Sequence, residues 1–124
     1  MKMPITNPLR VGLRQEQVIS PQCLVIFGAS GDLTHRKLIP ALFELFRQRR
    51  LPSEFALLGC ARRKWSDQEF RQRMTNHMTE KIKIDPLAWD QFSAGLFYES
   101  VDLQQPTDLV KLGGRLEEID RLRA

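Results

Sequence analysis

The sequence predicts an α/β fold in which helices flank a parallel β-sheet. Short apolar runs at 23–27 and 55–61 alternate with longer segments of helical periodicity. A glycine-containing turn at 28–33 joins the first apolar run to the first helical segment. Strands that alternate with helices in this way are joined by right-handed crossovers and therefore lie parallel. The order of strand, helix, strand, helices, strand and helix predicts an incomplete Rossmann-like sheet, the first half of a doubly wound domain.

Size and composition fit one small domain. The chain has 124 residues, of which 42% are hydrophobic and 27% charged, so it is too apolar for a disordered tail. No apolar run is long enough to cross a bilayer, and the first residues lack the apolar stretch of a signal peptide. We therefore expect a cytoplasmic protein with no membrane partner. Cys23 and Cys60 lie in strand-like runs and are expected to be reduced core residues, so we predict no disulfide and no metal site.

The net charge of +4 is concentrated in one stretch. Residues 28–64 include eight basic and three acidic residues, and the rest of the chain is close to neutral. Such a stretch binds either nucleic acid or a small phosphorylated ligand. The cations cluster around a turn, and no extended basic face or aromatic platform accompanies them. The sequence therefore favours the small ligand, with no nucleic-acid partner.

The first half of the chain contains two predicted strands. Residues 1–22 hold three prolines and no periodicity, which predicts an extended leader, so the domain is expected to cover 23–124. Residues 23–27 and 55–61 are predicted to be buried strands. Pro40 falls inside the helical pattern between them and predicts a kink or a separate first turn. The predicted apolar face of this helix consists of Leu38, Leu42, Leu45 and Phe46.

Three helices and a strand are predicted in the second half. A capping box from Ser66 to Glu69 starts a helix that runs to about Lys81. The pair Asp85-Pro86 starts another helix. Residues 96–101 are predicted to form a strand whose side chains alternate between buried and exposed. The last helix starts at Thr107, is interrupted by two glycines, and has the apolar face Leu109, Leu112, Leu116, Ile119 and Leu122.

The turn after the first strand has the features of a phosphate site. Gly28 and Gly31 let the backbone turn sharply and approach a pyrophosphate without a Cβ in the way. The helix that follows would direct free amides and a positive dipole at the phosphate. The alternative is that the glycines only form a tight turn. The strand-turn-helix context favours a dinucleotide.

The end of the second strand carries cations where many dinucleotide sites carry an acid. An NAD site places a carboxylate there for the ribose hydroxyls, whereas an NADP site places an arginine for the 2′-phosphate. Here the strand is followed by Arg62, Arg63 and Lys64. The alternative is a solvated basic turn. The position favours NADP.

These motifs resemble the opening of the glucose-6-phosphate dehydrogenase family. The resemblance rests on residues 26–34, I-F-G-A-S-G-D-L-T, on R-K-L at 36–38, and on Pro40, which interrupts the first helix in that family. Gly59, Ala61 and Arg62 match the family's arginine for the 2′-phosphate. The resemblance implies an NADP cofactor and the binding residues Gly28, Ala29, Ser30, Gly31, Asp32, Leu33, Lys37, Arg62, Asp102 and Leu103, the last two on the adenine side.

The same resemblance implies that the catalytic part lies elsewhere. The family oxidises glucose 6-phosphate to 6-phosphogluconolactone with NADP, a reaction that leads into the pentose phosphate pathway. Its catalytic histidine lies in an R-I-D-H-Y motif and its substrate lysine in an E-K-P motif, and neither occurs here. The sequence suggests no carboxylate partner for His35 or His77, and both are expected to be surface histidines rather than a catalytic base, so no catalytic residue is assigned.

We therefore expect the N-terminal NADP-binding portion of such a dehydrogenase, without its catalytic domain and catalytically incompetent by itself. Glucose 6-phosphate would be a partner only of a longer parent protein. The alternative is a non-catalytic module that binds NADP or another phosphorylated ligand. In a doubly wound sheet the first strand lies between the second and the fourth. Without a fourth strand, 23–27 would have an unpaired apolar edge, which predicts poor solubility or a homo-oligomer.

Overall fold

The computed structural model describes residues 23–81 and 83–123 and shows an α/β protein. The predicted leader at 1–22 lies outside the described residues. The elements are β1 (Cys23–Phe27), the π-helical turn η1 (Thr34–Leu38), α2 (Ile39–Arg47), β2 (Ala56–Ala61), α3 (Asp67–Lys81), α4 (Pro86–Ser93), β3 (Leu96–Ser100) and α5 (Pro106–Arg123). The predicted order of strands and helices is confirmed. No helix in these ranges is long and apolar enough to span a membrane.

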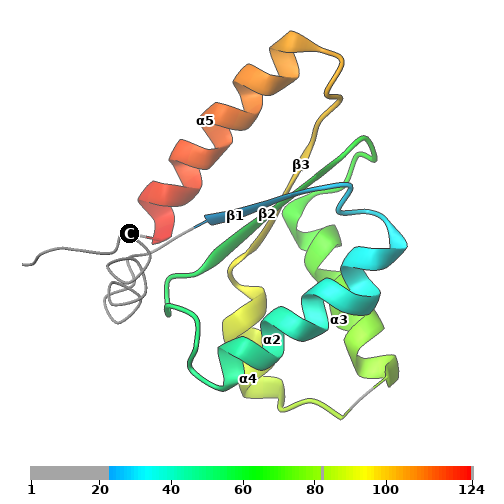
Figure 1. Cartoon of the computed structure of the whole chain (residues 1–124), viewed down its shortest axis with the longest axis vertical. Helices are drawn as coiled ribbons and strands as arrows, with labels where there is room; N and C mark the ends of the chain where they lie inside the picture. The colour runs from blue at the N-terminus through cyan, green and yellow to red at the C-terminus, as the bar shows by residue number, and fades with distance from the viewer. Residues whose placement is uncertain (1–22, 82, 124) are drawn as a thin grey trace, which may run out of the picture.

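The three strands form a parallel sheet in the order β1-β2-β3. Helices α2, α3 and α4 cover one face and α5 covers the other (Figure 1). The side chains of β2 alternate between these two layers: Leu57 packs in the core under α2, α3 and α4, whereas Leu58 and Cys60 pack under α5. Both cysteines are free, as predicted. The central strand is thus apolar on both faces, which explains its continuous apolar run.

The side-chain burial of the two outer strands, β1 and β3, differs from the prediction. In β1, Leu24 is 40% and Phe27 53% exposed, because no strand in the described residues pairs with its outer side. The predicted alternation in β3 is wrong, since Leu96, Phe97 and Tyr98 are all buried. Leu96 and Tyr98 face the α3 layer while Phe97 faces α5. Helices therefore cover both faces of this strand.

Pro40 divides the first helical segment in two, which is one of the two arrangements that we expected. The amide of Ile39 donates to the carbonyl of Thr34, which is the five-residue spacing of a π-turn. Pro40 then occupies the first turn of α2, where its missing N–H costs nothing. The predicted face packs on the core, together with Ile39 and Phe43, which are more deeply buried.

The remaining helices begin where their caps predict. The Ser66 hydroxyl accepts from the Glu69 amide at 3.0 Å, and the Asp85 carboxylate accepts from the Leu87 amide at 3.3 Å. Helix α5 continues through both glycines. Leu112 and Ile119 are buried and Leu116 is half-buried, but Leu109 and Leu122 are exposed. An 18-residue helix is longer than strands of five or six residues, so only its middle covers the sheet.

Candidate functional site

The glycine turn is bonded to the end of β2. Gly28 has a φ of +79°, a conformation that favours glycine. Its amide donates to the Cys60 carbonyl at 2.7 Å, and the Ala29 amide donates to the same oxygen at 3.1 Å. The Gly31 amide donates to the Gly28 carbonyl at 2.9 Å. The turn is therefore held rigidly, but these three amides are used within the protein and are not free for a phosphate, contrary to the simplest expectation for such a turn.

Each glycine around this turn has a different role. A Cβ on Gly28 would meet no atom within 4 Å, so open space lies beside it. A Cβ on Gly31 would lie 3.2 Å from the Gly28 carbonyl, so this glycine allows the turn to close. A Cβ on Gly59 in β2 would lie 2.6 Å from the Ala29 Cβ. The fully buried Ala29 thus packs directly on the strand beneath it, and Gly28 leaves room for a ligand above.

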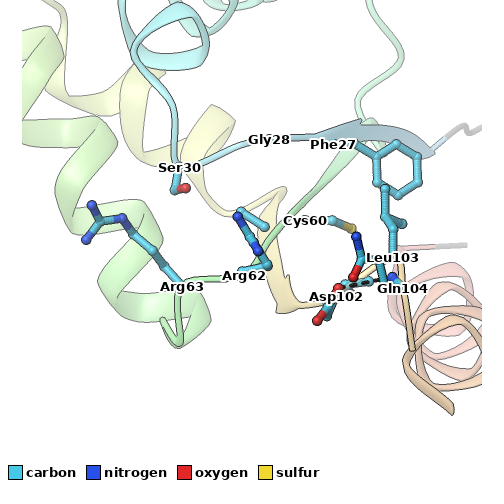
Figure 2. Close-up of a pocket in the computed structure, with 11 residues that line it drawn as sticks. Phe27, Gly28, Ser30, Cys60, Arg62, Arg63, Asp102, Leu103 and Gln104 are labelled. Carbon is cyan, nitrogen blue, oxygen red and sulfur yellow. Dashed lines mark hydrogen bonds between the residues drawn. The ribbon is translucent and has the colours of Figure 1, made fainter. Parts of the chain in front are cut away.

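A cleft of about 670 Å³ lies along the carboxyl ends of the three strands. The predicted residues Gly28, Ser30, Arg62, Asp102 and Leu103 line it, and they come from the segments that follow β1, β2 and β3. In Figure 2, Arg62, Arg63 and Ser30 lie on one side of the cleft, and Asp102, Leu103 and Gln104 on the other. The structure therefore brings together five predicted residues that are up to 75 positions apart in sequence.

The other five predicted residues do not line the cleft. Ala29 lies beneath the turn, and Gly31 closes it. The Asp32 carboxylate lies 2.8 Å from the Arg36 guanidinium and 3.2 Å from His35 Nε2. Leu33 is 71% exposed, and Lys37 is exposed on η1. Within the described chain, these residues surround the turn rather than face the cleft.

The cleft has six further lining residues outside the predicted binding set: Phe27, Cys60, Ala61, Arg63, Val101 and Gln104. All of them lie in the last two residues of a strand or in the segment that follows one. This position in the sequence could have identified them, because parallel strands bring their carboxyl ends to one edge of the sheet. Burial, with a smaller effect of the nearby Glu99 carboxylate, raises the pKa of the Cys60 thiol to about 11. This thiol is therefore protonated at neutral pH and is not a nucleophile.

The two sides of the cleft have opposite polarity. No carboxylate in the described residues forms an ion pair with Arg62 or Arg63, so their charges are available to an anion. On the other side, the Asp102 carboxylate accepts from the Gln104 amide at 3.0 Å. A ligand with an anionic end and a hydrogen-bond-donor end would suit this arrangement.

The two histidines are not the separate surface groups that we expected. Their rings stack, with centroids 3.6 Å apart and planes 11° apart. The His35 side chain is only 18% exposed, so it is less exposed than the expected surface residue, and it lies beside Asp32, a carboxylate that the sequence did not suggest as its partner. The contact joins η1 to α3, and neither histidine lines the cleft. No cluster of three metal-ligating side chains occurs in the described ranges.

Comparisons with known proteins identify relatives of this arrangement. The family model described as "Glucose-6-phosphate dehydrogenase, NAD binding domain" matches residues 25–124. Glucose-6-phosphate 1-dehydrogenase of Aggregatibacter actinomycetemcomitans is 42% identical over 78% of this chain and 20% of its own length. The enzyme of the same name from Chlamydia pneumoniae is 38% identical over 89% of this chain and 22% of its own length. The chain thus spans about a fifth of these relatives.

Solved structures agree with the sequence comparison. A glucose-6-phosphate dehydrogenase in complex with glucose-6-phosphate superposes with a TM-score of 0.71 at 28% identity, over 82% of this chain and 21% of that one. The enzyme from Mycobacterium avium shares the fold, with a TM-score of 0.69 at 24% identity, over 76% of this chain and 21% of that one. The family match, the parallel sheet and the cleft at its carboxyl edge show that the chain belongs to the glucose-6-phosphate dehydrogenase family, in the domain that binds a nicotinamide dinucleotide.

Proposed function

We propose that the cleft binds NADP and that the chain is the NADP-binding portion of a glucose-6-phosphate dehydrogenase. The observation that carries the proposal is the pair of exposed arginines, free of acidic partners in the described residues, that follows β2 beside the Gly28 turn. A carboxylate at this position would repel a 2′-phosphate, whereas a guanidinium forms charge-assisted hydrogen bonds with it.

The lining residues suggest how the cofactor would lie. Ser30 and the open side of Gly28 would face the pyrophosphate, and Arg62 would bind the 2′-phosphate. Asp102 and Leu103 would lie on the adenine side. Of the predicted residues outside the cleft, Ala29, Gly31, Asp32 and Leu33 would shape the turn, and Lys37 would add positive charge near it. NADP, when bound, supplies the hydride acceptor, and this chain would bind and orient the cofactor.

Oxidation of glucose 6-phosphate is proposed for a longer protein that contains this chain. The 124-residue sequence lacks the R-I-D-H-Y and E-K-P motifs to which the resemblance assigns the catalytic histidine and the substrate lysine. We therefore propose that the chain alone binds the dinucleotide without turning over the sugar phosphate. The alternative is that the chain is a non-catalytic binding module. Such a module would have the same cleft but no sugar-phosphate partner.

The test compares two charge reversals of equal size. Arg62→Glu should weaken NADP binding at least about 10-fold, because it replaces a charge-assisted hydrogen bond by repulsion. NAD, which has no 2′-phosphate, should bind nearly as before. Isothermal titration calorimetry with both dinucleotides measures the difference.

Arg50→Glu is the matched control. Arg50 is exposed and precedes β2, so it lies toward the opposite edge of the sheet from the cleft. It should leave the affinity for NADP almost unchanged, whereas a nonspecific effect of positive charge would weaken binding in both variants. Equal binding of NADP by the parent chain and Arg62→Glu would refute the proposed 2′-phosphate site.

A further inference from the structure

The backbone that carries Arg62 and Arg63 is held by side chains of β3. The Tyr98 hydroxyl donates to the Arg63 carbonyl at 2.7 Å, and the Ser100 hydroxyl donates to the Arg62 carbonyl at 3.3 Å. Within the described chain, residues 62–64 form no backbone-backbone hydrogen bond. Hydrogen bonds from two hydroxyl groups of the neighbouring strand therefore hold this turn in place.

Tyr98 is itself rigidly placed. Its side chain is 3% exposed, and its ring lies 5.3 Å from the rings of both Trp65 and Phe70. Its amide donates to an Asp67 carboxylate oxygen at 2.8 Å, which connects β3 to the start of α3. Packing and hydrogen bonding thus aim the phenol oxygen at one carbonyl. A buried hydroxyl that has such a partner is not free to reorient.

This anchoring matters because an arginine side chain is long and flexible. A guanidinium binds a phosphate with selectivity only if its Cα and the direction of its Cβ are fixed, since ordering a mobile turn upon binding costs affinity. In Figure 2 both arginine side chains rise from the end of β2 on the side of Ser30. The two hydrogen bonds from the hydroxyl groups to the carbonyls of Arg62 and Arg63 hold the backbone of these arginines in place before a ligand binds.

We propose that Tyr98 and Ser100 are positioning residues that set the preference of the cleft for a 2′-phosphorylated adenosine by holding the Arg62–Arg63 turn. The proposal rests on the proposed NADP function. It predicts that the two hydroxyl groups affect binding of the 2′-phosphate and not binding of the rest of the nucleotide, although neither Tyr98 nor Ser100 is among the residues that line the cleft.

The experiment measures Kd of the 124-residue chain for 2′,5′-ADP and for 5′-AMP by calorimetry. Tyr98→Phe and Ser100→Ala each remove one hydroxyl group. Each should raise Kd for 2′,5′-ADP about 2- to 10-fold, the effect of one hydrogen bond, and leave 5′-AMP within about 2-fold. Ser93→Ala is the control, because it removes a hydroxyl bonded to the Asp90 carbonyl at 3.3 Å in α4, away from the cleft.

A second arm separates positioning from a general loss of structure. In a chain with Arg62→Gln and Arg63→Gln, adding Tyr98→Phe should no longer change Kd for 2′,5′-ADP, because no charge is left to position. An additional loss of affinity in this background would overturn the proposal. Circular dichroism checks folding, and if Tyr98→Phe is unfolded, Ser100→Ala decides, since Ser100 is only partly buried.

The outcomes distinguish this proposal from the proposed function. If both hydroxyl variants match the parent, or weaken both nucleotides equally, the positioning role is wrong. An Arg62-dependent preference for 2′,5′-ADP in the parent chain would then still support the NADP site. If the parent chain does not distinguish the two nucleotides, the proposed function fails, and the positioning role fails with it.

Discussion

At Gly59 the glycine turn packs so closely on the sheet that no side chain fits between them. A Cβ at this position would lie 2.6 Å from the Ala29 Cβ and 3.1 Å from Phe70 Cζ. Both neighbours are fully buried, so neither has space into which to move. The turn that borders the cleft therefore lies against β2 only because residue 59 has no side chain.

Replacing this glycine should destabilise the fold. Gly59→Ala is expected to lower the free energy of unfolding by about 1–3 kcal/mol through overpacking. The control is Gly113→Ala in α5, where a Cβ meets nothing within 4 Å. That change should raise stability by about 0.5–1 kcal/mol, because alanine is the better helix former. Urea titration measures both, and equal effects of the two substitutions would contradict the packing argument.

The two outer strands present different edges. Side chains of α3 occupy the outer edge of β3: the Arg71 guanidinium donates to the Leu96 carbonyl at 2.6 Å, and Asp67 accepts from the Tyr98 amide. In the described chain no comparable group covers the outer edge of β1, whose five residues are all uncharged. An uncovered apolar edge readily pairs with another strand. The expected self-association should therefore proceed through β1 and not through β3.

A single charge on β1 tests this asymmetry. Leu24→Lys places a lysine on a side chain that is already 40% exposed, so the core is little disturbed, and repulsion should oppose pairing of two β1 edges. Sedimentation velocity should show less association than in the parent chain. Val110→Lys on α5 adds the same charge at a position that is 78% exposed and away from the sheet edge. A parent chain that is monomeric at all concentrations would refute the prediction.

The stability of the whole molecule should decline in alkaline solution. Burial raises the pKa of Cys60 from 9.0 to about 11 and that of Tyr98 from 10.0 to about 12. Above pH 9 the unfolded chain loses these protons first, so it binds fewer protons than the folded chain, and the free energy of unfolding falls as pH rises. The stabilising contribution is fully present below pH 9 and is lost as pH rises through the folded values.

Urea titration from pH 8 to pH 11 measures this decline. Cys60→Ala removes one of the groups whose pKa is raised by burial, so the stability of this variant should depend less steeply on pH between 9 and 11 than that of the parent chain. The comparison of slopes isolates the thiol from the other groups that titrate there. Parallel slopes for the two proteins would show that Cys60 does not contribute.

The elements and their order follow from local sequence. An apolar run bounded by glycine, a serine three residues before a glutamate, and an aspartate before a proline each act over a few residues. These signals predicted β1, β2 and α3 at nearly their observed bounds, and they predicted the start of α4. The same local pattern carried the family resemblance and located the glycine turn and Arg62.

Which side chains are buried, and which groups meet at the cleft, depended on contacts between distant segments. The alternation predicted for β3 was wrong because helices on both faces bury consecutive side chains, and β1 is more exposed than predicted because its outer side has no neighbour in the described residues. The stack of His35 on His77 joins two helical segments that no short pattern connects. Tyr98 bonds a carbonyl 35 residues earlier in the chain. Periodicity tells which side chains share a face of one element, but only packing of all the elements decides what covers that face and which groups meet at the cleft.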